Sequence, residues 1–110
     1  MKKNILITGV GGDIGQSIIK CLKAVNRHTW LIGCDIDKYA AGQVMVYKFY
    51  IAPPVKNKDA YCRFIEKIIG KENIDYIFPS TEAEIEFFND SRPRWDKRVK
   101  IFMDFIDVRI

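Results

Sequence analysis

A glycine-rich turn between an apolar segment and an amphipathic segment constrains this chain more than any other feature. The turn spans residues 8–15 and reads Thr-Gly-Val-Gly-Gly-Asp-Ile-Gly. Residues 3–8 before it are typical of a short strand. Residues 13–26 after it predict a helix whose apolar face carries Ile14, Ile18, Leu22 and Val25. A strand, a glycine turn and a helix in this order predict the first half of a βαβ unit, in which free N–H groups at the helix start can hold an anion.

The rest of the chain alternates between strand-like and helix-like segments. We expect strands at 30–34, 46–51, 76–78 and 99–105, a helix at 59–70 that ends at Gly70, a helix from Thr81 onward, and a polar connection over 90–98. Thr81 and Glu84 have the spacing of a capping box. The alternation predicts an α/β, Rossmann-like three-layer domain with a parallel five-stranded sheet in the order 3-2-1-4-5. In that order, the turns after the first and fourth strands reach one crevice.

Length and composition set further limits. The 110 residues predict a single domain over 1–110, and 48% hydrophobic with 29% charged residues is typical of a globular protein. The net charge of +4 is spread along the chain, which does not favour nucleic acid as a partner. No apolar run is long enough for a signal sequence or a membrane span, so we expect a cytoplasmic protein without membrane contact. Because no helix follows the fifth strand, we expect a piece of a longer protein.

Cysteine, histidine and the basic residues near the end offer weaker signals. Cys21, Cys34 and Cys62 lack metal-ligand spacing, so we expect reduced, buried thiols and no metal site. His28 falls in a turn, where we expect a surface side chain. The basic stretch Arg92 to Lys100 surrounds Trp95, a pattern that can bind nucleic acid but that also suits a solvated loop or a surface facing another domain.

The glycine turn leaves a dinucleotide-binding alternative open. The pattern G-x-G-x-x-G fails, because Ile14 occupies its third glycine position. The pattern T-G-x-x-G-x-x-G fits four residues, namely Thr8, Gly9, Gly12 and Gly15. With Asp35 after the second strand as a ribose ligand, this spacing is similar to the NAD(P)-binding domain of an extended short-chain dehydrogenase or epimerase. Alternatively, the glycines only permit a tight turn, and Asp35 with Asp37 caps a local turn.

The turn after the fourth strand argues against a dehydrogenase. Pro79 and the acidic helix start at Glu82 would place negative charge near a pyrophosphate, and no Tyr-x-x-x-Lys pair follows. A third hypothesis is a regulatory module that binds a nucleotide or another small molecule.

Four segments together give the chain its strongest resemblance. The first is the glycine turn with its flanks, the second ends at Asp35, the third is Tyr-Ile-Ala-Pro-Pro at 50–54, and the fourth is Ile-Asp-Tyr-Ile-Phe-Pro-Ser-Thr-Glu-Ala-Glu at 74–84. In this combination the chain resembles, over nearly its whole length, the N-terminal (pre-ATP-grasp) domain of ATP-grasp ligases. It is similar in particular to ligases like the carbamoyl-phosphate synthase large chain.

The resemblance implies a ligase in which ATP drives formation of an acyl phosphate that an amine or ammonia attacks. ATP and Mg²⁺ would bind to a C-terminal ATP-grasp domain, which is the expected partner. The present domain would wall one side of the cleft and help to hold a small carboxylate or amine substrate, without catalytic residues or activity of its own. Carried onto this chain, the resemblance implies six substrate-binding residues: Gly11, Gly12, Asp13, Ser80, Thr81 and Glu82. Glu82 would orient an ammonium group.

Overall fold

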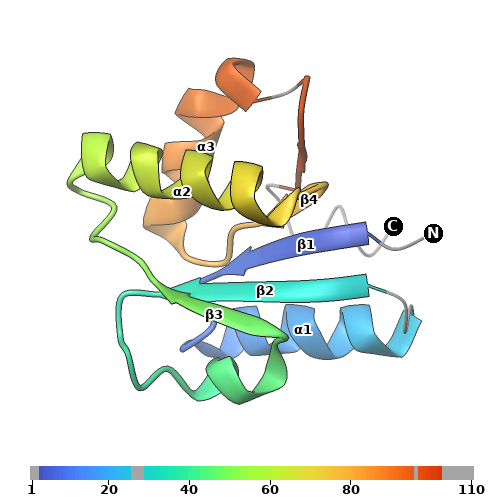
Figure 1. Cartoon of the computed structure of the whole chain (residues 1–110). Helices are drawn as coiled ribbons and strands as arrows, with labels where there is room; N and C mark the ends of the chain where they lie inside the picture. The colour runs from blue at the N-terminus through green and yellow to red at the C-terminus, as the bar shows by residue number, and fades with distance from the viewer. Residues whose placement is uncertain (1–2, 26–28, 96, 103–110) are drawn as a thin grey trace.

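Five parallel strands form one sheet in the order β3-β2-β1-β4-β5, which confirms the predicted topology (Figure 1). The computed structural model describes residues 3–25, 29–95 and 97–102. Its strands are β1 (Lys3–Thr8), β2 (Thr29–Asp35), β3 (Lys48–Ile51), β4 (Tyr76–Phe78) and β5 (Lys100–Ile101). The central strand β1 pairs with both neighbours, so that Ile5 lies opposite Leu31 on one side and Tyr76 on the other. Residues 103–105 of the predicted fifth strand lie outside the described residues.

Helices cover both faces of the sheet and complete the three layers. The helices are α1 (Asp13–Val25), the 3-10 helix η1 (Ala41–Met45), α2 (Lys58–Glu72) and α3 (Glu82–Trp95). Figure 1 shows α1 below the sheet and α2 with α3 above it. Side chains alternate along β1 accordingly, because Ile5 and Ile7 belong to the cluster with α1, whereas Leu6 belongs to the cluster with α2 and α3.

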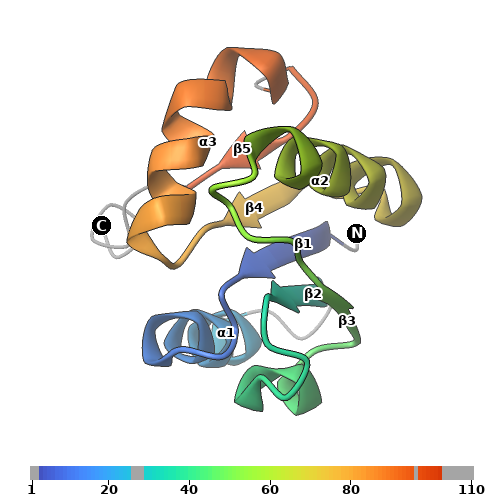
Figure 2. The ribbon, with the colours of Figure 1, turned by 90° about the vertical axis from the view of Figure 1, so that its left-hand side faces the viewer.

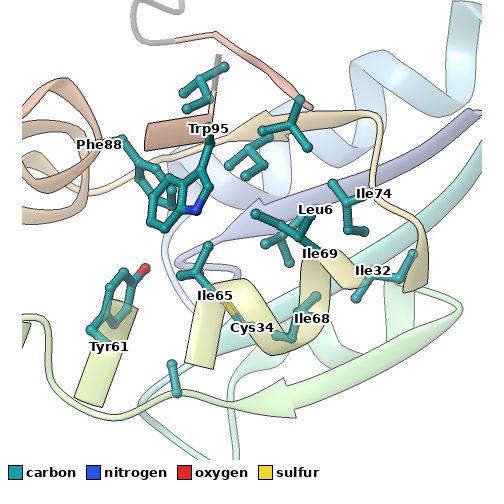
Figure 3. Close-up of a cluster of buried hydrophobic side chains, with 14 of the residues drawn as sticks. Leu6, Ile32, Cys34, Tyr61, Ile65, Ile68, Ile69, Ile74, Phe88 and Trp95 are labelled. Carbon is teal, nitrogen blue, oxygen red and sulfur yellow. The ribbon is translucent and has the colours of Figure 1, made fainter. Parts of the chain in front are cut away.

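The larger core lies between the sheet and the pair α2 and α3 (Figure 3). Ile65 and Ile69 of α2 pack over Leu6, while Phe88 and Trp95 reach the same cluster from α3. Trp95 is only 1% exposed. Full burial of each large apolar side chain stabilises the fold by roughly 1.5–3 kcal/mol, so this cluster fixes α3 against α2.

The buried face of α1 differs from the predicted one. Ile18 is buried and Leu22 partly buried as predicted, but Ile14 and Val25 are exposed. Gly15 and Ile19 are buried in their place. A Cβ atom at Gly15 would lie 2.5 Å from the carbonyl oxygen of Gly9, so this side of α1 packs directly on the backbone of the glycine turn. That close approach orients α1 so that Ile14 and Val25 are exposed.

Two predicted helix ends were wrong. α2 does not stop at Gly70 but continues to Glu72. Its C-cap is Asn73, whose φ of 51° is left-handed and whose N–H donates to the Ile69 carbonyl. The predicted polar connection over 90–98 is helical as far as Trp95. Burial of Trp95 against Phe88, with ring centroids 5.7 Å apart, favours continuing α3 through this polar sequence.

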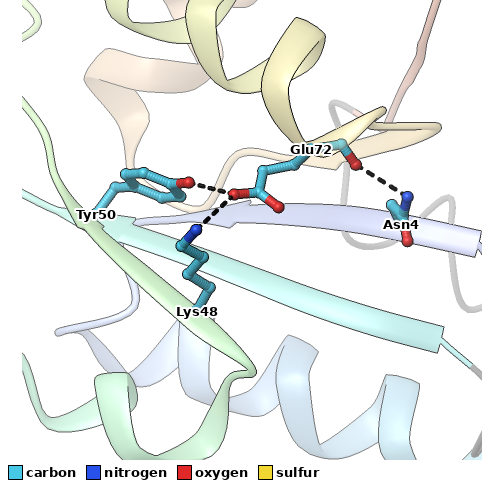
Figure 4. A network of polar contacts seen from close by, with 4 residues as sticks. All are labelled: Asn4, Lys48, Tyr50 and Glu72. Carbon is cyan, nitrogen blue, oxygen red and sulfur yellow. Dashed lines mark hydrogen bonds and ion pairs between the residues drawn. The ribbon is translucent and has the colours of Figure 1, made fainter.

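A polar network ties the edge strand β3 to the end of α2 (Figure 4). The Tyr50 hydroxyl donates to the Glu72 carboxylate, and Lys48 Nζ lies 3.4 Å from the same oxygen. The Asn4 side-chain amide donates to the Glu72 carbonyl at 2.9 Å. The edge strand is therefore held by side chains in addition to its backbone pairing with β2.

Candidate functional site

The loops after β1 and β4 meet at the edge of the sheet where the strands end, here called the carboxyl edge (Figure 2). The Ser80 hydroxyl donates to the Thr8 carbonyl at 2.6 Å. Gly9 has a φ of +68°, and a Cβ atom there would lie 2.5 Å from Ser80 Oγ. Glycine is therefore required at this position both for its backbone conformation and for the contact between the two loops.

A cavity of about 410 Å³ opens beside this contact. Its walls come from the glycine turn, the end of β2, the segment between β3 and α2, the first turns of α2 and the start of α3. The polar lining residues include Asp35, Lys56, Tyr61, Thr81 and Glu84. Ligands of open α/β sheets bind at this edge, where the strand order reverses.

Glu84 is the more buried of the two acids that line the cavity. Thr81 Oγ1 donates to Glu84 Oε1 at 2.9 Å and accepts the Glu84 N–H at 3.2 Å, which confirms the predicted capping interaction. The Tyr61 hydroxyl donates to Glu84 Oε2. Glu84 and Tyr61 are 7% and 1% exposed. The carboxyl group is thus held in place from both α2 and α3.

Burial sets the electrostatics of this cluster. It raises the pKa of the Glu84 carboxyl, as does the neighbouring charge of Asp35, while the hydrogen bonds from Tyr61 and Thr81 act in the opposite direction. Burial also raises the pKa of the Tyr61 phenol and of the Cys34 thiol. Both groups therefore stay protonated near neutral pH, and Cys34 is not a nucleophile there.

Asp35, at the end of β2, caps the glycine turn. Its Oδ2 accepts the Gly11 N–H at 2.8 Å, and its Oδ1 accepts the Asp37 N–H at 2.9 Å. A phosphate placed against the Gly11 N–H would meet this carboxylate. The local-turn interpretation of Asp35 agrees with these contacts, and the geometry does not favour a dinucleotide on the turn.

Comparison with known families adds the decisive observation. The family model described as "PylC-like, N-terminal domain" matches residues 5–102. The chain belongs to this family. It is a pre-ATP-grasp domain, the kind of N-terminal domain found in ATP-grasp ligases.

The same fold occurs in solved structures of other proteins. Among the matching chains is a dTDP-glucose 4,6-dehydratase from Bacillus anthracis, in complex with NAD, with a TM-score of 0.61 and 16% sequence identity. The match covers 90% of this pre-ATP-grasp domain and 36% of the dehydratase chain. At this identity the likeness shows the fold alone. No curated protein matches the chain.

The pre-ATP-grasp domain places the six predicted substrate-binding residues unequally. Thr81 lines the cavity, and Ser80 is buried with its hydroxyl bound to the Thr8 carbonyl. The other four are exposed or lie outside the cavity lining, namely Gly11, Gly12, Asp13 and Glu82. Of the residues predicted for dinucleotide binding, Gly9 and Asp35 line the cavity, whereas Gly12 and Gly15 do not. For both sets of residues, a role in binding a substrate or a dinucleotide stays a prediction.

Among the lining residues that were not predicted as site residues, Tyr61 and Glu84 are the buried polar ones. The sequence indicated no role for Tyr61 in the site and assigned Glu84 to the helix cap. The spacing of Glu84 could have identified it as a site residue. Glu84 precedes the buried Phe87 and Phe88 by three and four residues, and so it lies on the same face of α3. An acidic residue on an apolar helix face is a better candidate than Glu82, which is exposed.

The remaining predicted features contribute little to the site. Trp95 is buried and cannot stack on a nucleic-acid base, and Arg94 pairs with Glu66 at 2.9 Å. The expectation of buried thiols holds for Cys34 but not for Cys21, which is exposed, or Cys62, which is partly exposed. His28 lies outside the described residues. Within the described part of the chain, no three His, Cys, Asp or Glu side chains gather into a metal site, and no helix is long and apolar enough to cross a membrane.

Proposed function

We propose that this domain forms the substrate-side wall of the active site in an ATP-dependent carboxylate–amine or carboxylate–ammonia ligase of the carbamoyl-phosphate synthase-like type. The observation that carries the proposal is the cavity at the carboxyl edge, in a domain of the PylC-like N-terminal family. ATP and Mg²⁺ would bind to the partner ATP-grasp domain. The present domain would position a substrate and would have no activity alone.

Exposed apolar side chains beside the cavity support a partner domain at this edge. Ile36 follows β2 directly and is 64% exposed, Tyr39 is 77% exposed, and Ile51 at the end of β3 is 58% exposed. All three lie at or just after the carboxyl ends of β2 and β3, and exposed large apolar side chains are typical of a surface that another protein surface covers. A domain docked there would close the cleft over the cavity.

The lining suits the chemistry of the proposed reaction. The carboxylate substrate attacks the terminal phosphorus of ATP and releases ADP; the amine then attacks the acyl carbon and releases phosphate. Water that reaches the acyl phosphate would hydrolyse it without product. Ile36, Pro54, Val55 and Ala83 line the cavity with apolar surface, which would exclude water once the partner domain covers it.

The geometry gives less support to the dehydrogenase or epimerase alternative. A dinucleotide pyrophosphate needs the N–H groups of the glycine turn, and the Asp35 carboxylate already accepts that of Gly11. The negative charge of Asp35 would also oppose a phosphate at this position.

The test pairs this domain with an ATP-grasp domain, in one natural polypeptide or as two separate chains, and measures ADP release with candidate acids and amines. We expect release only when both domains are present. Tyr39→Asp should reduce it strongly by weakening the docking of the two domains. Val25→Asp is the matched control, because Val25 is 80% exposed at the end of α1 remote from the glycine turn. ADP release by this domain alone, or equal effects of both variants, would contradict the proposal.

A further inference from the structure

More acidic than basic side chains line the cavity. Asp35 and Glu84 are its two acids, and Lys56 is the single basic residue among those that line it. Lys56 is exposed, so solvent screens its charge, whereas Glu84 is buried. Tyr61 and Cys34, which also face Glu84, stay protonated and add no positive charge. The interior of the cavity is therefore suited to a cation.

Glu84 lacks a cationic partner. Its two carboxylate oxygens each accept one hydrogen bond, from Thr81 and Tyr61, and each keeps capacity for another. In the described part of the chain no lysine or arginine forms an ion pair with it. An unpaired carboxylate in a buried position is costly, and a side chain retained there at such a cost is a candidate for ligand binding.

A second buried polar group lies beside Glu84. Thr8 is fully buried, and its hydroxyl oxygen has no hydrogen-bond partner within ordinary geometry. Its side-chain interactions with Glu84 and Tyr61 nevertheless act to lower the pKa of both groups. The Thr8 hydroxyl therefore faces the Tyr61–Glu84 pair and, like the hydroxyl groups of Tyr61 and Thr81, brings no positive charge to it.

From this arrangement we infer that the cavity binds the amine substrate of the proposed ligase, as an ammonium group on a short apolar body. The ammonium would bind at the Glu84 carboxylate, with Asp35 adding negative potential, and the apolar body would lie against Ile36 and Val55. This inference rests on the proposed function and selects the amine over the carboxylate as the substrate held here. A carboxylate in the same place would face two acids and only the exposed Lys56.

The test uses three probes with the same four-carbon body and different charge: n-butylammonium, 1-butanol and butyrate. Binding to this chain is followed by the amide NMR shifts of Gly9 and Glu84 at neutral pH. We expect saturable shifts from n-butylammonium, with an affinity at least about tenfold higher than that of butyrate. Glu84→Gln should weaken n-butylammonium about tenfold and leave 1-butanol unchanged, because glutamine keeps the shape and loses the charge.

Glu86→Gln is the matched control, since Glu86 is exposed two residues further along α3 and should bind n-butylammonium like the parent chain. Asp35→Asn is a second variant, expected to weaken n-butylammonium less than Glu84→Gln does, and thermal unfolding checks that each variant is folded. Butyrate binding as tightly as n-butylammonium, an unchanged affinity in Glu84→Gln, or no saturable shift with any probe would overturn the inference. None of these results would remove the ligase function, which is tested separately by ADP release from the two-domain protein.

Discussion

Two tyrosine–glutamate hydrogen bonds hold α2, one near each end, and their surroundings are opposite. At the C-terminal end, Tyr50 donates to Glu72, and Lys48 lies beside the same carboxylate. Near the N-terminal end, Tyr61 donates to Glu84, which is deeper and has no basic partner in the described chain. The first pair joins α2 to the edge of the sheet, and the second lies at the cavity.

The difference shows how environment decides what one pair of residue types does. The hydrogen bond from Tyr50 lowers the pKa of Glu72, and Lys48 lowers it further, so ionised Glu72 stabilises the fold. Burial raises the pKa of Glu84 despite an equivalent hydrogen bond from Tyr61. Glu72 has a cation beside it, Lys48, whereas Glu84 has none in the described part of the chain, as expected of a site that binds a cationic ligand.

The largest expected difference between the pairs concerns packing. The Tyr61 ring lies 4.9 Å from that of Phe87 and 6.2 Å from that of Phe64, between centroids. Tyr61→Ala should therefore lower the free energy of unfolding by about 4 kcal/mol. Tyr50→Ala should cost only about 1 kcal/mol, because Tyr50 is partly exposed. Urea unfolding measures both values, and equal losses would contradict the comparison.

Removal of the hydroxyl groups alone should give a smaller difference. Tyr61→Phe leaves a buried carboxylate short of a donor and should cost about 2 kcal/mol at neutral pH. Tyr50→Phe should cost about 1 kcal/mol or less, since Lys48 and solvent remain available to Glu72. The Tyr61→Phe loss should shrink on acidification, because Glu84 becomes neutral. A loss independent of pH would show that the carboxylate is not the group affected.

The two glutamates should contribute opposite slopes to stability against pH. Glu72 has a lowered pKa, so its contribution is present above the unfolded-state pKa and is lost as the pH falls through the folded-state pKa. Glu84 has a raised pKa, so the folded state binds its proton more tightly and loses stability as the pH rises from the unfolded-state value through the folded-state one. Glu72→Gln and Glu84→Gln should each remove one slope, with effects on the order of 1 kcal/mol. Unfolding curves at several pH values would refute this assignment if both variants changed the profile in the same direction.

The smallest effect belongs to Lys48, whose side chain is 43% exposed. Lys48→Met should shift the Tm by no more than about 2 °C, and the shift should vanish near 1 M NaCl, where exposed ion pairs are screened. Thermal unfolding at low and high salt measures it. A large shift that persists in salt would indicate that Lys48 contributes to the fold by packing and not by charge.

Most of the fold could be predicted from the sequence because its signals are local. Alternating strands and helices with a glycine turn are sufficient for a parallel sheet in the observed order. The extent of α3 could not be predicted in this way. Its last turn is polar in sequence apart from Trp95, which packs on Phe87 and Phe88 of the same helix. The burial of Trp95 in the cluster with α2 and the sheet depends on the fold, and local polarity gives no sign of it.

The position of the candidate site in the fold could be predicted from the sequence, but the two residues that determine its chemistry could not. The meeting of the loops after β1 and β4 follows from strand order, and Ser80 against Thr8 confirms it. The chemistry of the cavity depends on Glu84 and Tyr61, which come from different helices and meet only in the folded chain. Local spacing explains Glu84 as a cap for α3, and that explanation is correct but incomplete.

The most direct test of this account is a carbon-13 NMR titration of the Glu84 and Glu72 carboxyl groups in one sample, with and without n-butylammonium. We predict that Glu84 titrates at higher pH than Glu72, and that n-butylammonium lowers the pKa of Glu84 while leaving that of Glu72 unchanged. If Glu84 titrates at or below Glu72, or if n-butylammonium does not move its pKa, the cavity is not a site for a cationic substrate and the central claim fails.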